Sequence, residues 1–142
     1  QSLTHLGTLA LESLPSVGGD LASLQSLTDL NQIQLINVPW VQGDLASLWS
    51  LADLDFLQLN KLPSLQGDLA SLRSLTHLRT LGLDELPSVQ GDLASLRTNL
   101  RFIEFINLPS VQGDLASLQS LAHLGHLILT SLPSVQGDLA SL

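Results

Sequence analysis

The chain has 142 residues, no cysteine and a formal net charge of −8. Without cysteine there is no disulfide framework and no thiolate site. The acidic balance argues against nucleic acid and against an anionic membrane surface as partners, although six of the 13 acidic residues come from one repeated position. No apolar stretch approaches the roughly 20 residues of a membrane-spanning helix. We therefore expect no nucleic-acid partner and no membrane span in this segment.

One segment recurs along the whole chain. Residues 15–24 read Pro-Ser-Val-Gly-Gly-Asp-Leu-Ala-Ser-Leu, and five further copies follow at intervals of 24 residues, with one interval of 22. A period of roughly 20 to 50 residues is typical of solenoids, in which each unit buries its apolar face against its neighbours. Residues 1–142 are then one array of about six repeats. We expect both ends to be uncapped, as in the middle of a longer array.

Each repeat is predicted to begin with a strand and to end with a helical turn. Leu-x-Leu pairs such as Leu9 and Leu11 place two leucines on one face of a strand, and stacked strands would form a parallel sheet. The proline after the strand cannot donate to a ladder. The glycine that follows suits a turn with positive φ, and the next aspartate would cap the turn Leu-Ala-Ser-Leu. The predicted caps are Asp20, Asp44, Asp68, Asp92, Asp114 and Asp138.

These repeats resemble the leucine-rich repeat. Leu78-x-x-Leu81-x-Leu83 matches the core of that motif, and the 24-residue period with Val-x-Gly-x-Leu is closest to the plant-type subclass. The resemblance covers the whole chain. It implies a right-handed solenoid of six coils, with a parallel β-sheet on the concave face and short 3-10 or helical turns on the convex side. Because Ala stands where the family has a convex proline, the second, convex strand is left open. The resemblance also implies a secreted or cell-surface location.

The repeats differ mainly at the outward positions of the predicted strands. A recognition surface shows sequence variation on one face while the rest of the repeat stays constant. Neutral sequence change at solvent-facing positions gives the same pattern. Bulky apolar side chains on that face favour binding, although such residues also favour strands. A further column (Ser13, Asn37, Lys61, Glu85, Asn107 and Ser131) is expected to extend the face. The predicted partner-binding residues are Gln32, Gln34, Ile36, Phe56, Gln58, Asn60, Thr80, Asp84, Phe102, Glu104, Ile106 and His126.

Two polar columns invite a metal interpretation. The repeated aspartates could form a calcium ladder, but one Asp per turn supplies few of the six to eight oxygens that calcium takes, and capping explains the same positions. His5 with Asp29, and Asp53 with His77, could bind a metal or share hydrogen bonds at the surface. No Ser-His-Asp set converges. We expect no enzyme, no cofactor and no metal.

Two function hypotheses remain. The first is a non-enzymatic module that binds a protein or peptide on its concave face. The alternative is a structural solenoid whose copies stack end to end through uncapped ends. Trp40 and Trp49, both in the second repeat, would mark an edge contact with another chain or fill a groove between turns. The 22-residue repeat is expected to tighten its helical turn and to weaken the contact between repeats 4 and 5.

Overall fold

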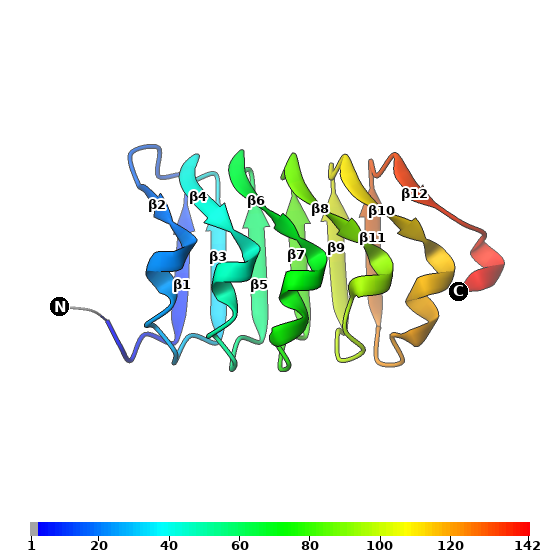
Figure 1. Ribbon diagram of the computed structural model, residues 1–142, viewed down its shortest axis with the longest axis horizontal. Helices are drawn as coiled ribbons and strands as arrows, with labels where there is room; N and C mark the ends of the chain where they lie inside the picture. The colour runs from blue at the N-terminus through cyan, green and yellow to red at the C-terminus, as the bar shows by residue number, and fades with distance from the viewer. Residues whose placement is uncertain (1–2) are drawn as a thin grey trace.

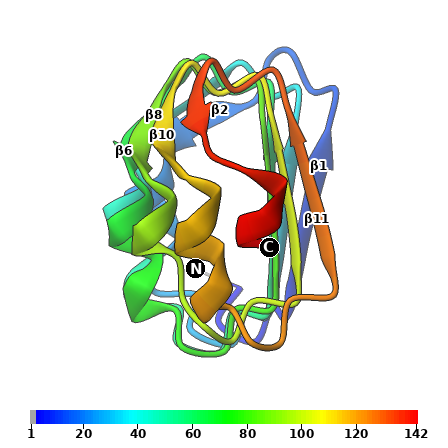
Figure 2. The ribbon, with the colours of Figure 1, turned by 90° about the vertical axis from the view of Figure 1, so that its right-hand side faces the viewer.

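The computed structural model describes residues 3–142 as one solenoid of six coils, whose two ends lie at opposite ends of the molecule (Figure 1). Each coil gives one strand to each of two parallel six-stranded sheets and one 3-10 turn between them. Figure 2 shows the first sheet along one side, with the second sheet and the 3-10 turns along the other. The predicted solenoid is confirmed, and the second strand that the sequence left open is present.

The first sheet consists of the strands predicted from the Leu-x-Leu pairs. Neighbouring strands pair at all five positions, so that Thr80 stands beside Phe56 on one side and Phe102 on the other. In the four middle coils the second and fourth residues of each strand are buried, and the first, third and fifth residues form three columns on the other side of the sheet. The strands are β1 (Thr8–Glu12), β3 (Gln32–Ile36), β5 (Phe56–Asn60), β7 (Thr80–Asp84), β9 (Phe102–Ile106) and β11 (His126–Thr130).

The second sheet is built from the constant part of the repeat. The glycine before each capping aspartate has the positive φ that the sequence predicts, but most of these glycines lie inside strands and not in a turn. The strands are β2 (Gly18–Asp20), β4 (Trp40–Asp44), β6 (Ser64–Asp68), β8 (Ser88–Asp92), β10 (Ser110–Asp114) and β12 (Ser134–Gln136). The 3-10 helices are η1 (Leu21–Leu24), η2 (Leu45–Leu48), η3 (Leu69–Ser74), η4 (Leu93–Ser95), η5 (Leu115–Ser120) and η6 (Leu139–Ser141).

Each 3-10 helix starts at an aspartate. The Asp Oδ1 atom accepts a hydrogen bond from the backbone N–H of the alanine two residues later, at 2.8 Å in every coil. The aspartates themselves are extended, which is the backbone geometry of an N-cap. One orphan donor per turn is thereby satisfied.

The core is a continuous stack of aliphatic side chains between the two sheets. Ile33, Leu57, Leu81 and Phe105 are fully buried, and the described residues include no buried polar or charged side chain. The matching apolar residues of the first and last coils are only partly buried. Burial is therefore most complete in coils two to five.

The short repeat keeps its place in the first sheet. Strands β7 and β9 pair across all five positions although the chain between them is two residues shorter. The shortening falls in and after η4, which has three residues where η3 and η5 have six. Asn99 fills the gap: its Nδ2 atom donates to the carbonyl oxygens of Thr76 at 2.7 Å and Leu78 at 2.8 Å.

Candidate functional site

The predicted binding residues lie in three columns on the solvent side of the first sheet, which we call the outer face. Because the strands pair in full register, each column crosses the strands at one height. Gln32, Gln34 and Ile36 stand on β3, and His126 stands on β11 at the other end. The remaining predicted residues occupy β5, β7 and β9: Phe56, Gln58, Asn60, Thr80, Asp84, Phe102, Glu104 and Ile106.

A hollow of about 390 Å³ opens in the middle of the outer face. Its walls are Phe56 and Phe102, on strands β5 and β9, and its floor is Thr80 and Gly82 on β7. Gln58 and Glu104 line it as well, one on each side of Gly82. The hollow exists because β7 presents two short side chains between two strands that present long ones.

The aromatic walls are less exposed than an outward position suggests. Phe56 and Phe102 are half-buried, and Phe102 lies against the ring of His126 with 5.7 Å between centroids. Sequence reasoning predicts that removing both phenylalanines leaves stability nearly intact, because outward residues contribute little to the core. Their burial corrects that expectation, since truncating buried aromatic surface costs stability.

A polar pair lies beside the hollow in the third column. Asn60 Nδ2 donates to Asp84 Oδ2 at 3.2 Å, while Asn60 Oδ1 and Asp84 Oδ1 are buried and accept no hydrogen bond. Burial raises the pKa of Asp84, and the carboxylates of Glu85 and Glu104 raise it further, whereas Lys61 and the Asn60 amide lower it. The surroundings of Asp84 are therefore short of positive charge and of hydrogen-bond donors.

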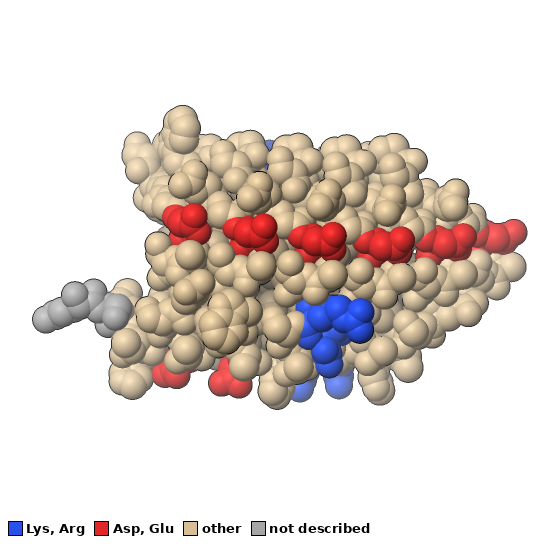
Figure 3. Space-filling view, in the orientation of Figure 1, with Lys and Arg blue, Asp and Glu red and all other residues tan. Residues whose placement is uncertain are grey.

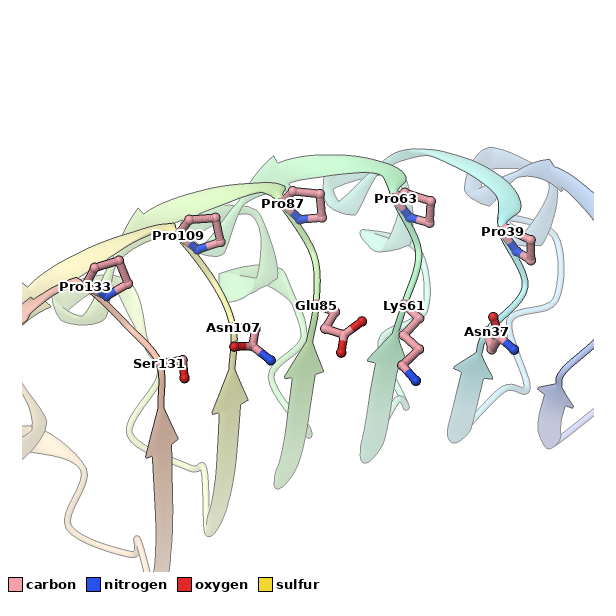
Figure 4. Close-up of a pocket in the computed structure, with 10 residues that line it drawn as sticks. All are labelled: Asn37, Pro39, Lys61, Pro63, Glu85, Pro87, Asn107, Pro109, Ser131 and Pro133. Carbon is pink, nitrogen blue, oxygen red and sulfur yellow. The ribbon is translucent and has the colours of Figure 1, made fainter.

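A second, longer groove of about 710 Å³ runs along the edge of the outer face, past the ends of the strands (Figure 4). Five prolines form one wall, one from each of coils two to six. The side chains two residues before them project from the strand ends. The lining residues are Asn37, Pro39, Lys61, Pro63, Glu85, Pro87, Asn107, Pro109, Ser131 and Pro133.

This groove corrects the prediction of a fourth outward column. Residues such as Asn37, Lys61 and Glu85 lie just beyond the strands, with φ between 51° and 54° in the left-handed region. That conformation turns the chain from the first sheet toward the proline. From the sequence, the proline is expected only to end the strand. Its recurrence at one position in every repeat is the signal for a continuous row of prolines.

The opposite side of the molecule carries the aspartate caps in a row along the solenoid, with basic side chains below the middle of that row (Figure 3). Arg97 and Arg73 meet there, because the Arg97 Nη1 atom donates to the Arg73 carbonyl oxygen. Trp40 and Trp49 are both exposed, at 68% and 63%, so neither fills a groove between turns.

The predicted histidine column forms individual hydrogen bonds. His5 Nδ1 lies 3.2 Å from Asp29 Oδ2, whereas His77 Nδ1 contacts the carbonyl oxygen of Ala52 and not Asp53. Within residues 3–142, no three His, Asp or Glu side chains come together in a group that could hold a metal ion. Across the same residues, no helix combines the length and apolarity needed to cross a membrane.

No protein-family model and no curated protein matches this sequence. Among solved structures, the chain is similar to the leucine-rich-repeat ectodomain of the receptor kinase SOBIR1 from Arabidopsis thaliana, at 24% identity and a TM-score of 0.66 over 91% of this chain and 71% of that chain. It is similar to the ectodomain of the plant membrane receptor kinase GASSHO1/SCHENGEN3 from Arabidopsis thaliana, solved in complex with CASPARIAN STRIP INTEGRITY FACTOR 2, at 23% identity and a TM-score of 0.61. That match covers 99% of this chain and 17% of that chain.

A third similar structure is the plant peptide hormone receptor RGFR1 in complex with RGF2, at 17% identity and a TM-score of 0.60. The match covers 91% of this chain and 25% of that chain, so this chain spans only a small part of both receptor complexes. The likeness shows the fold: the chain is a solenoid with the leucine-rich-repeat architecture.

Proposed function

We propose that the chain is a non-enzymatic repeat module that binds an extended peptide segment of a protein partner on the outer face of its first sheet. The observation that carries the proposal is the hollow between Phe56 and Phe102, placed at the centre of that face. Two of the similar structures are receptor complexes, with CASPARIAN STRIP INTEGRITY FACTOR 2 and with RGF2. They support a binding role for a solenoid of this architecture.

The shape of the face favours an extended partner over a small metabolite. Small ligands bind in clefts that enclose most of their surface, whereas this hollow is open along the sheet, and the proline groove runs past the strand ends at the edge of the same face. A chain that crosses the strands would meet one coil after another at a constant spacing. It would place one side chain in the hollow and lie with its backbone along the columns.

Binding energy in such an interface concentrates in a few large side chains that are surrounded by polar ones. Phe56 and Phe102 are the candidate anchors, with Ile36 and Ile106 on the same face at the far ends of β3 and β9. The outward polar side chains would give direction through hydrogen bonds. These are Gln34, Gln58, Asn60 and Glu104.

The test is a selection from a random peptide library displayed on phage, with the chain as the immobilised target. We expect peptides that bind the wild type to lose at least about tenfold in affinity for the Gly82→Leu variant, which corresponds to removing one good contact. Gly82 has no positive φ, and a Cβ there would meet Gln58 only at an ordinary 3.5 Å. Gly82→Leu therefore fills the hollow and leaves both phenylalanines in place.

Phe56→Ala with Phe102→Ala is the second arm, with its fold checked by circular dichroism because both rings are half-buried. Trp40→Ala with Trp49→Ala is the matched control, since both side chains are exposed away from the outer face. Peptides that bind Gly82→Leu as tightly as the wild type, or that depend on the tryptophans, would contradict the proposal.

A second candidate function is end-to-end association of copies of the chain. The observation behind it is the exposure of apolar side chains in the terminal coils, among them Leu3 at 70% and Leu139 at 80%. Under this proposal Leu139→Glu disperses oligomers that light scattering detects in the wild type, while the phenylalanine pair has no effect. A wild-type chain that is monomeric at every concentration tested would rule it out.

A further inference from the structure

The hollow on the outer face has a defined width. Thr80 stands between Phe56 and Phe102 in the first column, so the backbones at the two phenylalanines are two strand spacings apart, about 9.6 Å. A planar group midway between two side chains at that spacing lies within the roughly 6 Å at which a cation is attracted to an aromatic face. The gap is therefore wide enough for one flat cationic group with an aromatic ring on each side.

The second column supplies hydrogen-bonding groups at the same depth. Gly82 has Gln58 on one side and Glu104 on the other, and both line the hollow. A group lying over Gly82 would meet a carboxylate and a side-chain amide. Glu104 is half-buried, and among the described residues its carboxylate makes no hydrogen bond or ion pair.

The charge around Asp84, beside the hollow, is negative. Asp84, Glu85 and Glu104 lie near one another, with Lys61 as the nearby cation. Two buried acceptor atoms, Asn60 Oδ1 and Asp84 Oδ1, have no donor. The pKa of Asp84 is raised chiefly by burial and then by the carboxylates of Glu85 and Glu104. A positive charge in the hollow would be attracted to the Glu104 carboxylate, which lines it.

We propose that the hollow binds the side chain of an arginine in the extended peptide partner, with its guanidinium group between Phe56 and Phe102 and hydrogen-bonded to the Glu104 carboxylate. This inference rests on the proposed function. It names the side chain of the peptide that enters the hollow over β7, the strand of the fourth repeat. The aliphatic part of the arginine lies over Thr80 and Gly82. The other outward positions of the face contact the rest of the peptide.

Arginine fits this site better than lysine for two reasons. A guanidinium is flat and stacks on aromatic rings, whereas an ammonium is a compact, strongly hydrated charge. A guanidinium also presents two parallel N–H groups to one carboxylate and still has donors for a neighbouring amide oxygen. The Glu104 carboxylate and the Gln58 amide stand on opposite sides of Gly82, which matches that set of donors.

The experiment titrates the ¹⁵N-labelled chain with N-acetyl-arginine N-methylamide and follows amide shifts by NMR. The matched ligand is the citrulline analogue, which has the same shape without the charge. We expect saturable shifts at Gly82 and Glu104 with the arginine amide and at least about tenfold weaker binding of the citrulline amide, because a charge-assisted hydrogen bond and a cation–π contact are both lost.

Variants separate the parts of the site. Glu104→Gln and Gly82→Leu should each abolish the shifts, while Glu12→Gln, an equal loss of charge on β1, should leave them unchanged. Equal binding of the arginine and citrulline amides, or shifts that persist in Glu104→Gln, would overturn the inference.

The two proposals fail in different ways. The selected peptides could depend on the hollow and yet contain no arginine, while the arginine amide causes no shift. That result would leave the proposed function standing and remove this inference. If the selection yields no peptide while the arginine amide still shifts Gly82, the guanidinium site stands and the peptide-binding function falls.

Discussion

Asp92 and Gly113 fit together across the boundary between two coils. The Asp92 Oδ1 atom accepts a hydrogen bond from the N–H of Ala94 at 2.8 Å, and the same atom lies 2.7 Å from where a Cβ on Gly113 would stand. The glycine of each later coil likewise covers the capping aspartate of the coil before it. Gly19, in the first coil, covers nothing. The recurring Gly-Asp pair is thus a contact between coils as well as a helix cap.

Asp92→Ala should lower the free energy of unfolding by about 1 kcal/mol, because the Ala94 N–H loses its acceptor. Asp92→Asn keeps an acceptor oxygen at the same place and should cost much less. Urea unfolding measures both. Calcium should leave the melting temperature of the wild type unchanged, and a clear calcium-dependent rise would favour a metal ladder over capping.

Gly113→Ala should cost roughly 3 kcal/mol, because the new methyl group meets Asp92 Oδ1 and the Leu93 backbone in addition to the strain of a positive φ. Gly19→Ala is the matched control: its φ is also positive, but nothing lies within 4 Å of the added Cβ. It should cost about 1 kcal/mol. Equal losses of stability in urea unfolding would mean that backbone strain alone, and not the close contact between coils, makes glycine necessary at this position.

The first sheet could be predicted because the repeat length is nearly constant. A constant spacing puts the Leu-x-Leu pairs in register, and Phe56 accordingly stands between Gln32 and Thr80. The hollow was visible in the same columns, as two short residues flanked by long ones, once side-chain size is compared across strands. The second sheet was harder to predict, because Gln-Gly-Asp does not alternate between apolar and polar residues, which is the usual sign of a strand.

The proline groove could not be predicted from residue types alone. Its shape depends on left-handed backbone at positions such as Lys61 and Glu85, and residues other than Gly, Asn and Asp rarely adopt that conformation. Asn37 and Asn107 at the equivalent positions were the better indication. The close contact between Asp92 and Gly113 could not be predicted from the sequence either, because it joins residues of different coils.

Asn99→Ala should destabilise the chain by about 1 to 3 kcal/mol, because the carbonyl oxygens of Thr76 and Leu78 both lose a donor. His77→Ala is the matched control one repeat earlier, where an exposed side chain contacts one backbone carbonyl, that of Ala52, and the hydroxyl of its neighbour Thr76. Hydrogen exchange over residues 90–110 checks whether repeats 4 and 5 separate first. We expect weaker protection there than in repeats 2 and 3, and still weaker protection in Asn99→Ala. Uniform protection would contradict the prediction.

Asp84 should make the chain less stable as the pH rises. Burial, followed by the carboxylates of Glu85 and Glu104, raises the pKa of Asp84 above its usual value of 3.8. Between that value and the raised one the folded state holds more protons than the unfolded state, so stability falls with increasing pH. The penalty is complete above the folded-state pKa and absent well below 3.8.

Asp84→Asn removes this ionisation and keeps an oxygen that can accept from Asn60 Nδ2. Urea unfolding of both proteins, at a series of pH values from below 3.8 to neutral, gives a difference in which the other carboxyl groups largely cancel. The variant should become progressively more stable than the wild type as the pH rises, and the difference should level off once Asp84 is ionised in the folded state. A difference of the opposite sign would mean that the Asp84 carboxylate is stabilised by Lys61 and Asn60 more than it is destabilised by burial and its acidic neighbours. In that case the region would not be short of positive charge, which is the condition on which an arginine partner depends.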